Sequence, residues 1–189
     1  MVRVYPVRKD QLDDQIDSFP LTIISHRLGE LFWLMPSDGT SNGWDHPATY
    51  DQEVETPYYY STRFDDSLVQ TEFTPTARCG FFRFTFPSGK PVILLANRRE
   101  GSLSDQGSNS VSGVERFNDM QAFFYGEFNA PVQVQPGDNN RRLTVSAQGG
   151  QKVLEFRYGV SFISEEQARK NLAEQIPDWN FDQIKRNAR

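Results

Sequence analysis

The sequence predicts an all-β protein, a large antiparallel β-sandwich that ends in a short helical connector. Apolar and polar residues alternate with period two through much of residues 20–163, which is typical of strands with one buried face. Turn-forming residues recur between these runs, as they do in antiparallel sandwiches. A helical pattern is confined to residues 164–189, apart from one turn expected near residues 10–15. We therefore expect a sandwich domain over residues 1–163 and a helical connector over residues 164–189.

Six segments carry the strand pattern. The alternating segments are residues 69–73, 82–86, 143–147 and 154–162, the last with Phe162 as its final inward position. Residues 31–35 and 92–96 are apolar throughout, which favours strands that are covered on both faces. Burial on both faces implies at least two packed layers.

Turn chemistry separates these strands. Residues 87–90, Pro-Ser-Gly-Lys, predict a hairpin between two neighbouring strands, and residues 136–140 and 149–150 predict two further reversals. Residues 97–113 are rich in serine and glycine, so we expect an irregular stretch there. A flexible surface loop is the favoured interpretation, and a lid or a contact for a neighbouring domain is the alternative.

The end of the chain predicts two short helices. Ser164 and Gln167 have the spacing of a capping box, and Pro177 stops the first helix. Two pairs place an acid ahead of a base at i,i+4: Glu165 with Arg169, and Glu166 with Lys170. The inward positions expected for the two helices are Ala168, Leu172 and Ile176, then Phe181, Ile184 and Ala188. Trp179, between the helices, is expected to pack on the sandwich. Because the second helix runs to Arg189, we expect this connector to lead towards a further domain.

Composition excludes several classes of partner. Twenty basic and 25 acidic residues give a net charge of −5 without long runs, which argues against nucleic acid and an anionic membrane surface. No stretch approaches the roughly 20 apolar residues of a membrane span. The N-terminal residues lack the apolar core of a signal peptide. Cys79 is the single cysteine, so an internal disulfide and a thiolate metal cluster are excluded, and we expect it to be buried in a strand.

Motifs of common catalytic sites are absent. His26 and His46 are the only histidines and lack metal-binding spacing, and no nucleophile elbow, phosphate loop or dinucleotide fingerprint is present. Glycoside hydrolysis needs two carboxyl groups that face each other across a bond, about 5–10 Å apart. The acidic doublets at residues 13–14, 65–66 and 165–166 are instead expected to be solvated, because adjacent side chains on a strand point to opposite faces. We predict no catalytic residue and no metal ligand.

Three segments resemble a known family. The sharpest is residues 156–189, FRYGVSFISEEQARKNLAEQIPDWNFDQIKRNAR. The similarity continues through residues 57–97, PYYYSTRFDDSLVQTEFTPTARCGFFRFTFPSGKPVILLAN, and more weakly through residues 111–134. Together they resemble the N-terminal domain of glycoside hydrolase family 92, the calcium-dependent exo-α-mannosidases.

The resemblance implies a supersandwich-like domain that precedes an (α/α)6 barrel. In that family an inverting displacement occurs at the interface of the two domains, and the general acid, the general base and the calcium ligands belong to the barrel. The resemblance therefore carries no catalytic or metal-binding residue onto this chain, which alone is expected to lack glycosidase activity. The implied partners are an α-mannoside glycan and the chain's own C-terminal barrel, and the implied location is periplasmic or secreted.

The chain departs from the family near its start. Family members often have a histidine-rich stretch resembling GFSHTHLSG, whereas residues 18–30 here are SFPLTIISHRLGE. If polar residues of this chain face a sugar, we expect His26, Arg27 and Glu30 to do so, with Trp33 or Trp44 nearby. Trp44, in a polar loop, is the better candidate for an exposed aromatic platform. The competing interpretation is that His26 and Arg27 are satisfied at a strand end and that Trp33 belongs to the core.

The function expected from these observations is that of the sandwich domain of an α-mannosidase, which shapes the substrate pocket and docks the barrel. Two alternatives stay open. A stand-alone carbohydrate-binding sandwich would bind mannosides through Trp44. A purely structural docking domain would bind no sugar and would present an exposed apolar face.

Overall fold

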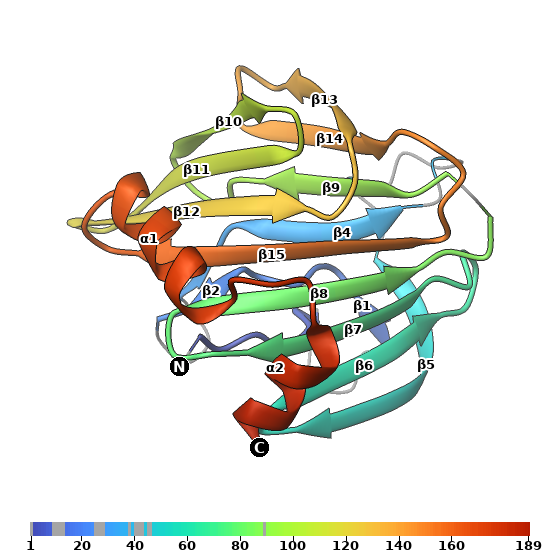
Figure 1. Ribbon diagram of the computed structural model, residues 1–189. Helices are drawn as coiled ribbons and strands as arrows, with labels where there is room; N and C mark the ends of the chain where they lie inside the picture. Colours follow the sequence, from blue (N-terminus) through green and yellow to red (C-terminus); the bar gives the residue numbers. More distant parts are fainter. Residues whose placement is uncertain are drawn as a thin grey trace.

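The structure is a computed structural model that describes residues 2–8, 14–24, 29–37, 39, 44, 47–88 and 90–189. Two antiparallel sheets share one apolar core, and two helices cover the outer face of the larger sheet (Figure 1). The all-β sandwich with short C-terminal helices is therefore confirmed.

The larger sheet has nine strands, in the order β1-β5-β6-β7-β8-β15-β12-β11-β10. Their bounds are β1 Gln15–Ile16, β5 Ala48–Thr56, β6 Tyr59–Phe64, β7 Gln70–Pro75, β8 Cys79–Thr85, β10 Gly101–Gly107, β11 Ser110–Phe117, β12 Met120–Phe128 and β15 Val153–Ser161. All neighbouring pairs are antiparallel.

The smaller sheet has four strands, in the order β13-β14-β9-β4, and a two-stranded hairpin lies apart from it. The bounds are β4 Trp33–Ser37, β9 Val92–Ala96, β13 Val132–Gly137 and β14 Arg142–Ala147, with β2 Thr22–Ile23 and β3 Glu30–Leu31 forming the hairpin. The apolar run over residues 31–35 is buried as expected, but it is broken into β3 and β4 by Phe32, whose φ of 60° leaves the strand conformation.

Aromatic rings cross the inner face of the larger sheet. Phe82 packs on Phe73 of the neighbouring strand (centroids 4.7 Å apart) and stacks at 6.1 Å on Tyr158. Phe156 and Phe128 continue the row at 4.6 Å. These rings are buried, so they stabilise the sandwich mainly through the apolar area that they remove from water.

Tyr158 lies between two glycines on neighbouring strands. Gly80 and Gly126 are its register partners, and a Cβ on Gly80 would come within 2.4 Å of the Tyr158 hydroxyl oxygen. The hydroxyl donates to the carbonyl oxygen of Leu21 at 2.7 Å. A single buried side chain thus ties the centre of the larger sheet to the segment that leads into β2.

Helix α1, Glu165–Gln175, lies across β15 and β12, and α2, Phe181–Ala188, lies against β7 (Figure 1). Ser164 caps α1 by accepting from the Gln167 N–H at 3.1 Å, but the Gln167 side chain donates to Asn171 rather than completing a capping box. Glu166 pairs with Lys170 as predicted, at 2.8 Å.

The predicted pair of Glu165 and Arg169 is wrong. Glu165 accepts from the Ser112 hydroxyl at 2.8 Å, while the Arg169 guanidinium lies 5.1 Å from the centre of the Tyr125 ring. Both side chains face the sheet, so tertiary partners replace the local one.

The inner side of this helical layer is apolar as predicted. The buried positions are Ala168, Leu172, Ile176 and Phe181, and they pack with Cys79, Phe81 and Tyr125 of the sheet. Trp179 packs edge-on against Phe81, with centroids 5.9 Å apart, so its predicted place on the sandwich is confirmed. Gly159 allows α1 to approach, because a Cβ there would lie 2.1 Å from the Ala168 carbonyl oxygen.

Three local predictions are wrong. Residues 87–90 do not form a hairpin, because β8 belongs to the larger sheet and β9 to the smaller one, so this turn crosses between layers. Residues 97–113 are not an irregular loop, since β10 and β11 pair there in an antiparallel hairpin. Phe162 does not continue the buried face of β15, which ends at Ser161, and its side chain is 50 % exposed.

Candidate functional site

The hairpin of β2 and β3 carries the segment in which sugar-binding residues were predicted. Glu30 lies in β3 opposite Ile23, and the Ile24 N–H donates to the Gly29 carbonyl at 2.9 Å. His26 and Arg27 lie outside the described residues, between the two strands. Their predicted role as sugar ligands stays a prediction.

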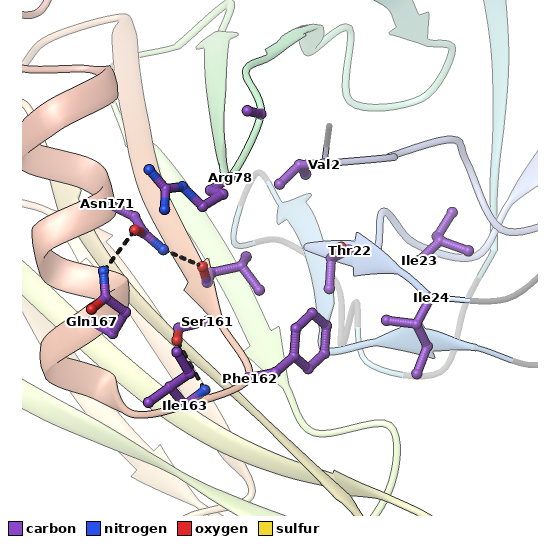
Figure 2. A pocket seen from close by; sticks show the side chains of 12 residues that line it. Val2, Thr22, Ile23, Ile24, Arg78, Ser161, Phe162, Ile163, Gln167 and Asn171 are labelled. Carbon is purple, nitrogen blue, oxygen red and sulfur yellow. Dashed lines mark hydrogen bonds between the residues drawn. The ribbon is translucent and has the colours of Figure 1, made fainter.

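A cavity of about 570 Å³ lies beside the base of this hairpin (Figure 2). Its walls come from Val2, from β2 and the residue after it, from the turn before β8, from the end of β15 and from α1. Segments that are far apart in the sequence therefore meet here. Figure 2 shows Ile23 and Ile24 on one side and the α1 side chains Gln167 and Asn171 on the other.

Four polar side chains around the cavity, those of Arg78, Ser161, Gln167 and Asn171, are already engaged in local structure. Asn171 donates to the Val160 carbonyl at 2.8 Å and accepts from Gln167 at 3.0 Å. The Ser161 hydroxyl accepts from the Ile163 N–H at 3.0 Å. Arg78 lies 3.4 Å from the Glu174 carboxylate. These bonds hold the end of β15 and the start of α1 in one arrangement.

No carboxylate is among the described residues that line this cavity. It therefore lacks the two facing carboxyl groups that glycoside hydrolysis requires. The described part of the chain brings together no group of three histidine, cysteine or acidic side chains that could hold a metal ion.

An apolar edge borders the cavity where β15 turns into α1. Phe162 is 50 % exposed and Ile163 is 78 % exposed, directly after buried Val160 and Ser161. Sequence reasoning missed this pair because Phe162 fits the strand alternation. The available signal was Ile163, which interrupts that alternation just before the capping residue Ser164.

Trp44 lies at a different place, over the smaller sheet. Its ring stacks on Trp33 with centroids 5.4 Å apart and an angle of 25°, and the Arg142 guanidinium lies 5.0 Å from its centre. Trp33 is buried in the core. Trp44 is half-buried and packs against that core. Neither Trp44 nor Glu30 lines the cavity beside α1, so the structure does not unite the predicted sugar-binding residues there.

Glu115 is a buried carboxyl group, but it lies between the layers rather than in a cleft. Burial raises the pKa of Glu115, although the Phe32 N–H donates to its carboxylate at 2.7 Å and favours the charged form. This bond fixes the break between β3 and β4. Because the carboxyl group has no exposed surface, a structural role fits it better than acid–base chemistry.

Cys79 is buried, as predicted, at the start of β8 beneath the helical layer. Burial raises the pKa of the Cys79 thiol to about 12. A thiol with that pKa carries almost no thiolate at neutral pH, so Cys79 is not a nucleophile. No helix in the described part of the chain is long and apolar enough to cross a membrane.

The chain was compared with protein-family models, curated proteins and solved structures. Residues 10–169 match the family model of the glycosyl hydrolase family 92 N-terminal domain. A sequence search of curated proteins finds no match.

Among solved structures, the chain is similar to the family GH92 inverting mannosidase BT2199 from Bacteroides thetaiotaomicron, with a TM-score of 0.81 and 23% identity. That match covers 94% of this chain and 28% of the mannosidase. The GH92 α-mannosidase BT3965 from the same organism gives a TM-score of 0.79 at 16% identity, over 99% of this chain and 33% of the other. The chain thus spans about a third of the length of these structures. On the family match, it belongs to the family of glycosyl hydrolase family 92 N-terminal domains.

Proposed function

We propose that this chain is the sandwich half of a family 92 α-mannosidase, in which a second domain supplies the catalytic residues. The observation that carries the proposal is the asymmetry of the structural matches. Nearly all of this chain aligns, 94% and 99%, but only 28% and 33% of the two mannosidases is covered. Two thirds of such an enzyme therefore has no counterpart in residues 1–189.

The chemistry of the described residues supports this division of labour. The one deeply buried carboxyl group, Glu115, has no exposed surface, and the cavity beside α1 lacks carboxylates. In the proposed enzyme the sandwich shapes one wall of the substrate pocket and holds the second domain, which brings the general acid, the general base and calcium. An exported location, periplasmic or secreted, belongs to the same proposal.

The direct test is hydrolysis by the intact protein that contains residues 1–189 and the chain that follows them. We expect mannose release from 4-nitrophenyl α-mannoside, and we expect a calcium chelator to reduce it. A panel of α-mannosides that all remain uncleaved by the intact, folded protein would contradict the proposal.

Sugar titration of the isolated chain separates the two alternatives. A carbohydrate-binding module predicts millimolar or tighter binding of mannosides, lost in Trp44→Ala. If the chain is a purely structural docking domain, the isolated chain should bind no mannoside. We favour docking, because the Trp44 ring already stacks on Trp33 whereas Phe162 and Ile163 are open to solvent.

A further inference from the structure

The pair of Phe162 and Ile163 is the most exposed apolar feature of the described chain. The two side chains are 50 % and 78 % exposed and adjacent in sequence. The other exposed large apolar residues each stand alone in the sequence: Tyr5, Val54, Leu68, Met120 and Val153. Single exposed apolar residues are ordinary, whereas a grouped apolar edge indicates an interaction surface.

The surface continues from this pair into the cavity beside α1. Ile23 and Ile24 from the β2 segment and Val160 from β15 contribute apolar wall to the same 570 Å³ space. Figure 2 shows the Phe162 ring between the end of β15 and the β2 segment. Phe162 and Ile163 therefore lie beside a cavity with apolar walls. This arrangement suits a partner that covers the two side chains and inserts an apolar side chain into the cavity.

The edge is held in place before any partner arrives. The Ser161 hydroxyl accepts from the Ile163 N–H at 3.0 Å, and Ser164 immediately afterwards caps α1. Asn171 fixes the Val160 carbonyl from the other side at 2.8 Å. A preorganised edge loses little conformational entropy on binding, which favours association.

The end of the chain lies at the same end of the larger sheet as the cavity. Lys185 of α2 lies 3.1 Å from the centre of the Tyr59 ring, at the first residue of β6. The first residues of β6 and β8 and the last residues of β7 and β15 share this end, as the antiparallel register requires. A domain that follows Arg189 would therefore start at the same end of the larger sheet as the apolar edge, on β6, which is three strands from β15.

We propose that Phe162, Ile163 and the adjoining cavity are the docking site for an apolar surface of the catalytic domain that follows this chain in the intact enzyme. The inference rests on the proposed function and adds the surface through which the two domains meet. The size of the missing part favours this occupant over a second copy, since about two thirds of the length of similar mannosidases is not represented here.

The test uses two separately purified parts, residues 1–189 and the chain that follows, whose association is measured by calorimetry alongside mannosidase activity of the mixture. The double variant Phe162→Ser/Ile163→Ser should weaken association by tenfold or more, on the order of the loss of two buried apolar side chains. The matched control Val54→Ser/Met120→Ser changes two other exposed apolar residues and should leave association unchanged. Urea unfolding of each variant of residues 1–189 should match the unsubstituted chain, because these side chains are exposed.

The outcomes separate the two proposals. In one outcome, the unsubstituted chain, Phe162→Ser/Ile163→Ser and Val54→Ser/Met120→Ser all bind the second part with equal affinity and restore activity equally. In that case the docking site is wrong and the proposed function stands. If the intact protein has no mannosidase activity, the proposed function fails. If residues 1–189 form a dimer that only Phe162→Ser/Ile163→Ser disrupts, while association with the second part is unchanged, the occupant is a second copy and the inference is overturned.

Discussion

The two faces of the larger sheet are built from alternate residues of the same strands, yet they are stabilised differently. Phe82 and Phe156 point into the core and pack on other rings. Their neighbours Arg83 and Arg157 point to the helical layer and make ion pairs. The inner face therefore depends on buried apolar area, whereas the outer face combines a smaller apolar cluster beneath the helices with directional bonds.

Twice on the outer face, an arginine binds a glutamate of the neighbouring strand and lies over an aromatic ring of the helical layer. Arg83 binds both carboxylate oxygens of Glu72, at 2.7 and 2.9 Å, and lies 4.3 Å from the centre of the Phe181 ring. In the second case Arg157 donates through Nε and Nη2 to one oxygen of Glu127, Oε2, at 3.2 and 2.6 Å. Its guanidinium carbon lies 4.4 Å from the centre of the Trp179 ring.

Arg157 also donates to the Ile176 carbonyl at 2.9 Å, where α1 ends. A planar guanidinium that donates to two different groups fixes their relative orientation as well as adding energy. The difference between the faces teaches that apolar packing alone can hold the two sheets together, while the helices add arginine contacts to their apolar cluster.

The largest expected effect is on the inner face. Phe82→Ala should lower the free energy of unfolding by about 3–5 kcal/mol, because it removes a fully buried ring and leaves a cavity. Urea unfolding followed by circular dichroism measures this. Met120→Ala, at an exposed position, is the control and should change stability by less than about 0.5 kcal/mol.

The next effect concerns the contact between helix and sheet. Gly159→Ala should cost about 1–3 kcal/mol, since the new Cβ would lie 2.1 Å from the Ala168 carbonyl oxygen and α1 must move. Fluorescence of Trp179 should report the displaced layer. Gly150→Ala adds a Cβ in open space and should leave both signals unchanged.

A smaller loss is expected when the outer arginine is shortened. Arg157→Lys keeps the charge but replaces the planar guanidinium, which donates to Glu127 and to the Ile176 carbonyl at once, and it should cost about 1–2 kcal/mol. Proteolysis within residues 164–189 should become faster than in the unsubstituted chain. Equal proteolysis rates would show that the arginine pairs do not position the helices.

A pH dependence should arise from the buried carboxyl group between the layers. Because burial raises the pKa of Glu115, the folded state holds this proton more tightly than the unfolded state. Its contribution to stability is complete below the ordinary pKa of 4.5 and is lost as the pH rises through the raised folded-state pKa. Urea unfolding at several pH values measures this effect. The free energy of unfolding should fall less steeply with rising pH in Glu115→Gln than in the unsubstituted chain. Burial also raises the pKa of Glu155, but this group contributes the same pH dependence to the unsubstituted chain and to Glu115→Gln.

The smallest effect is expected on the solvent side of α1. Glu166 and Lys170 form an exposed i,i+4 pair at 2.8 Å. Such pairs add little to stability, and salt screens them further. Glu166→Gln should therefore leave urea unfolding unchanged within error at physiological salt.

Local patterns were enough to predict the C-terminal helices and six strand segments, which correspond to β3 with β4, β7, β8, β9, β14 and β15. Alternation defined β15 and β8, and capping residues defined α1 and α2, because these signals depend on near neighbours in sequence. The hairpin at residues 87–90 was mispredicted because a turn does not specify which sheet receives the next strand. The strand β10 was missed because its serines and glycines have low strand propensity, and pairing with β11 overrides that preference.

The candidate site was less predictable than the fold. Its cavity joins Val2, Ile23, Arg78, Phe162 and Asn171, which only the fold brings together. The predicted positions Glu30 and Trp44 lie elsewhere, and His26 and Arg27 lie outside the described residues. Sequence patterns report burial along one segment, whereas this surface is made from the ends of several segments.

The central proposal is that this sandwich is one part of a two-domain glycoside hydrolase whose reacting groups belong to the other part. The most direct test is hydrolysis of 4-nitrophenyl α-mannoside by purified residues 1–189, with and without a calcium chelator. The account predicts a rate equal to that of buffer in both cases. Release well above buffer that a chelator abolishes would contradict it.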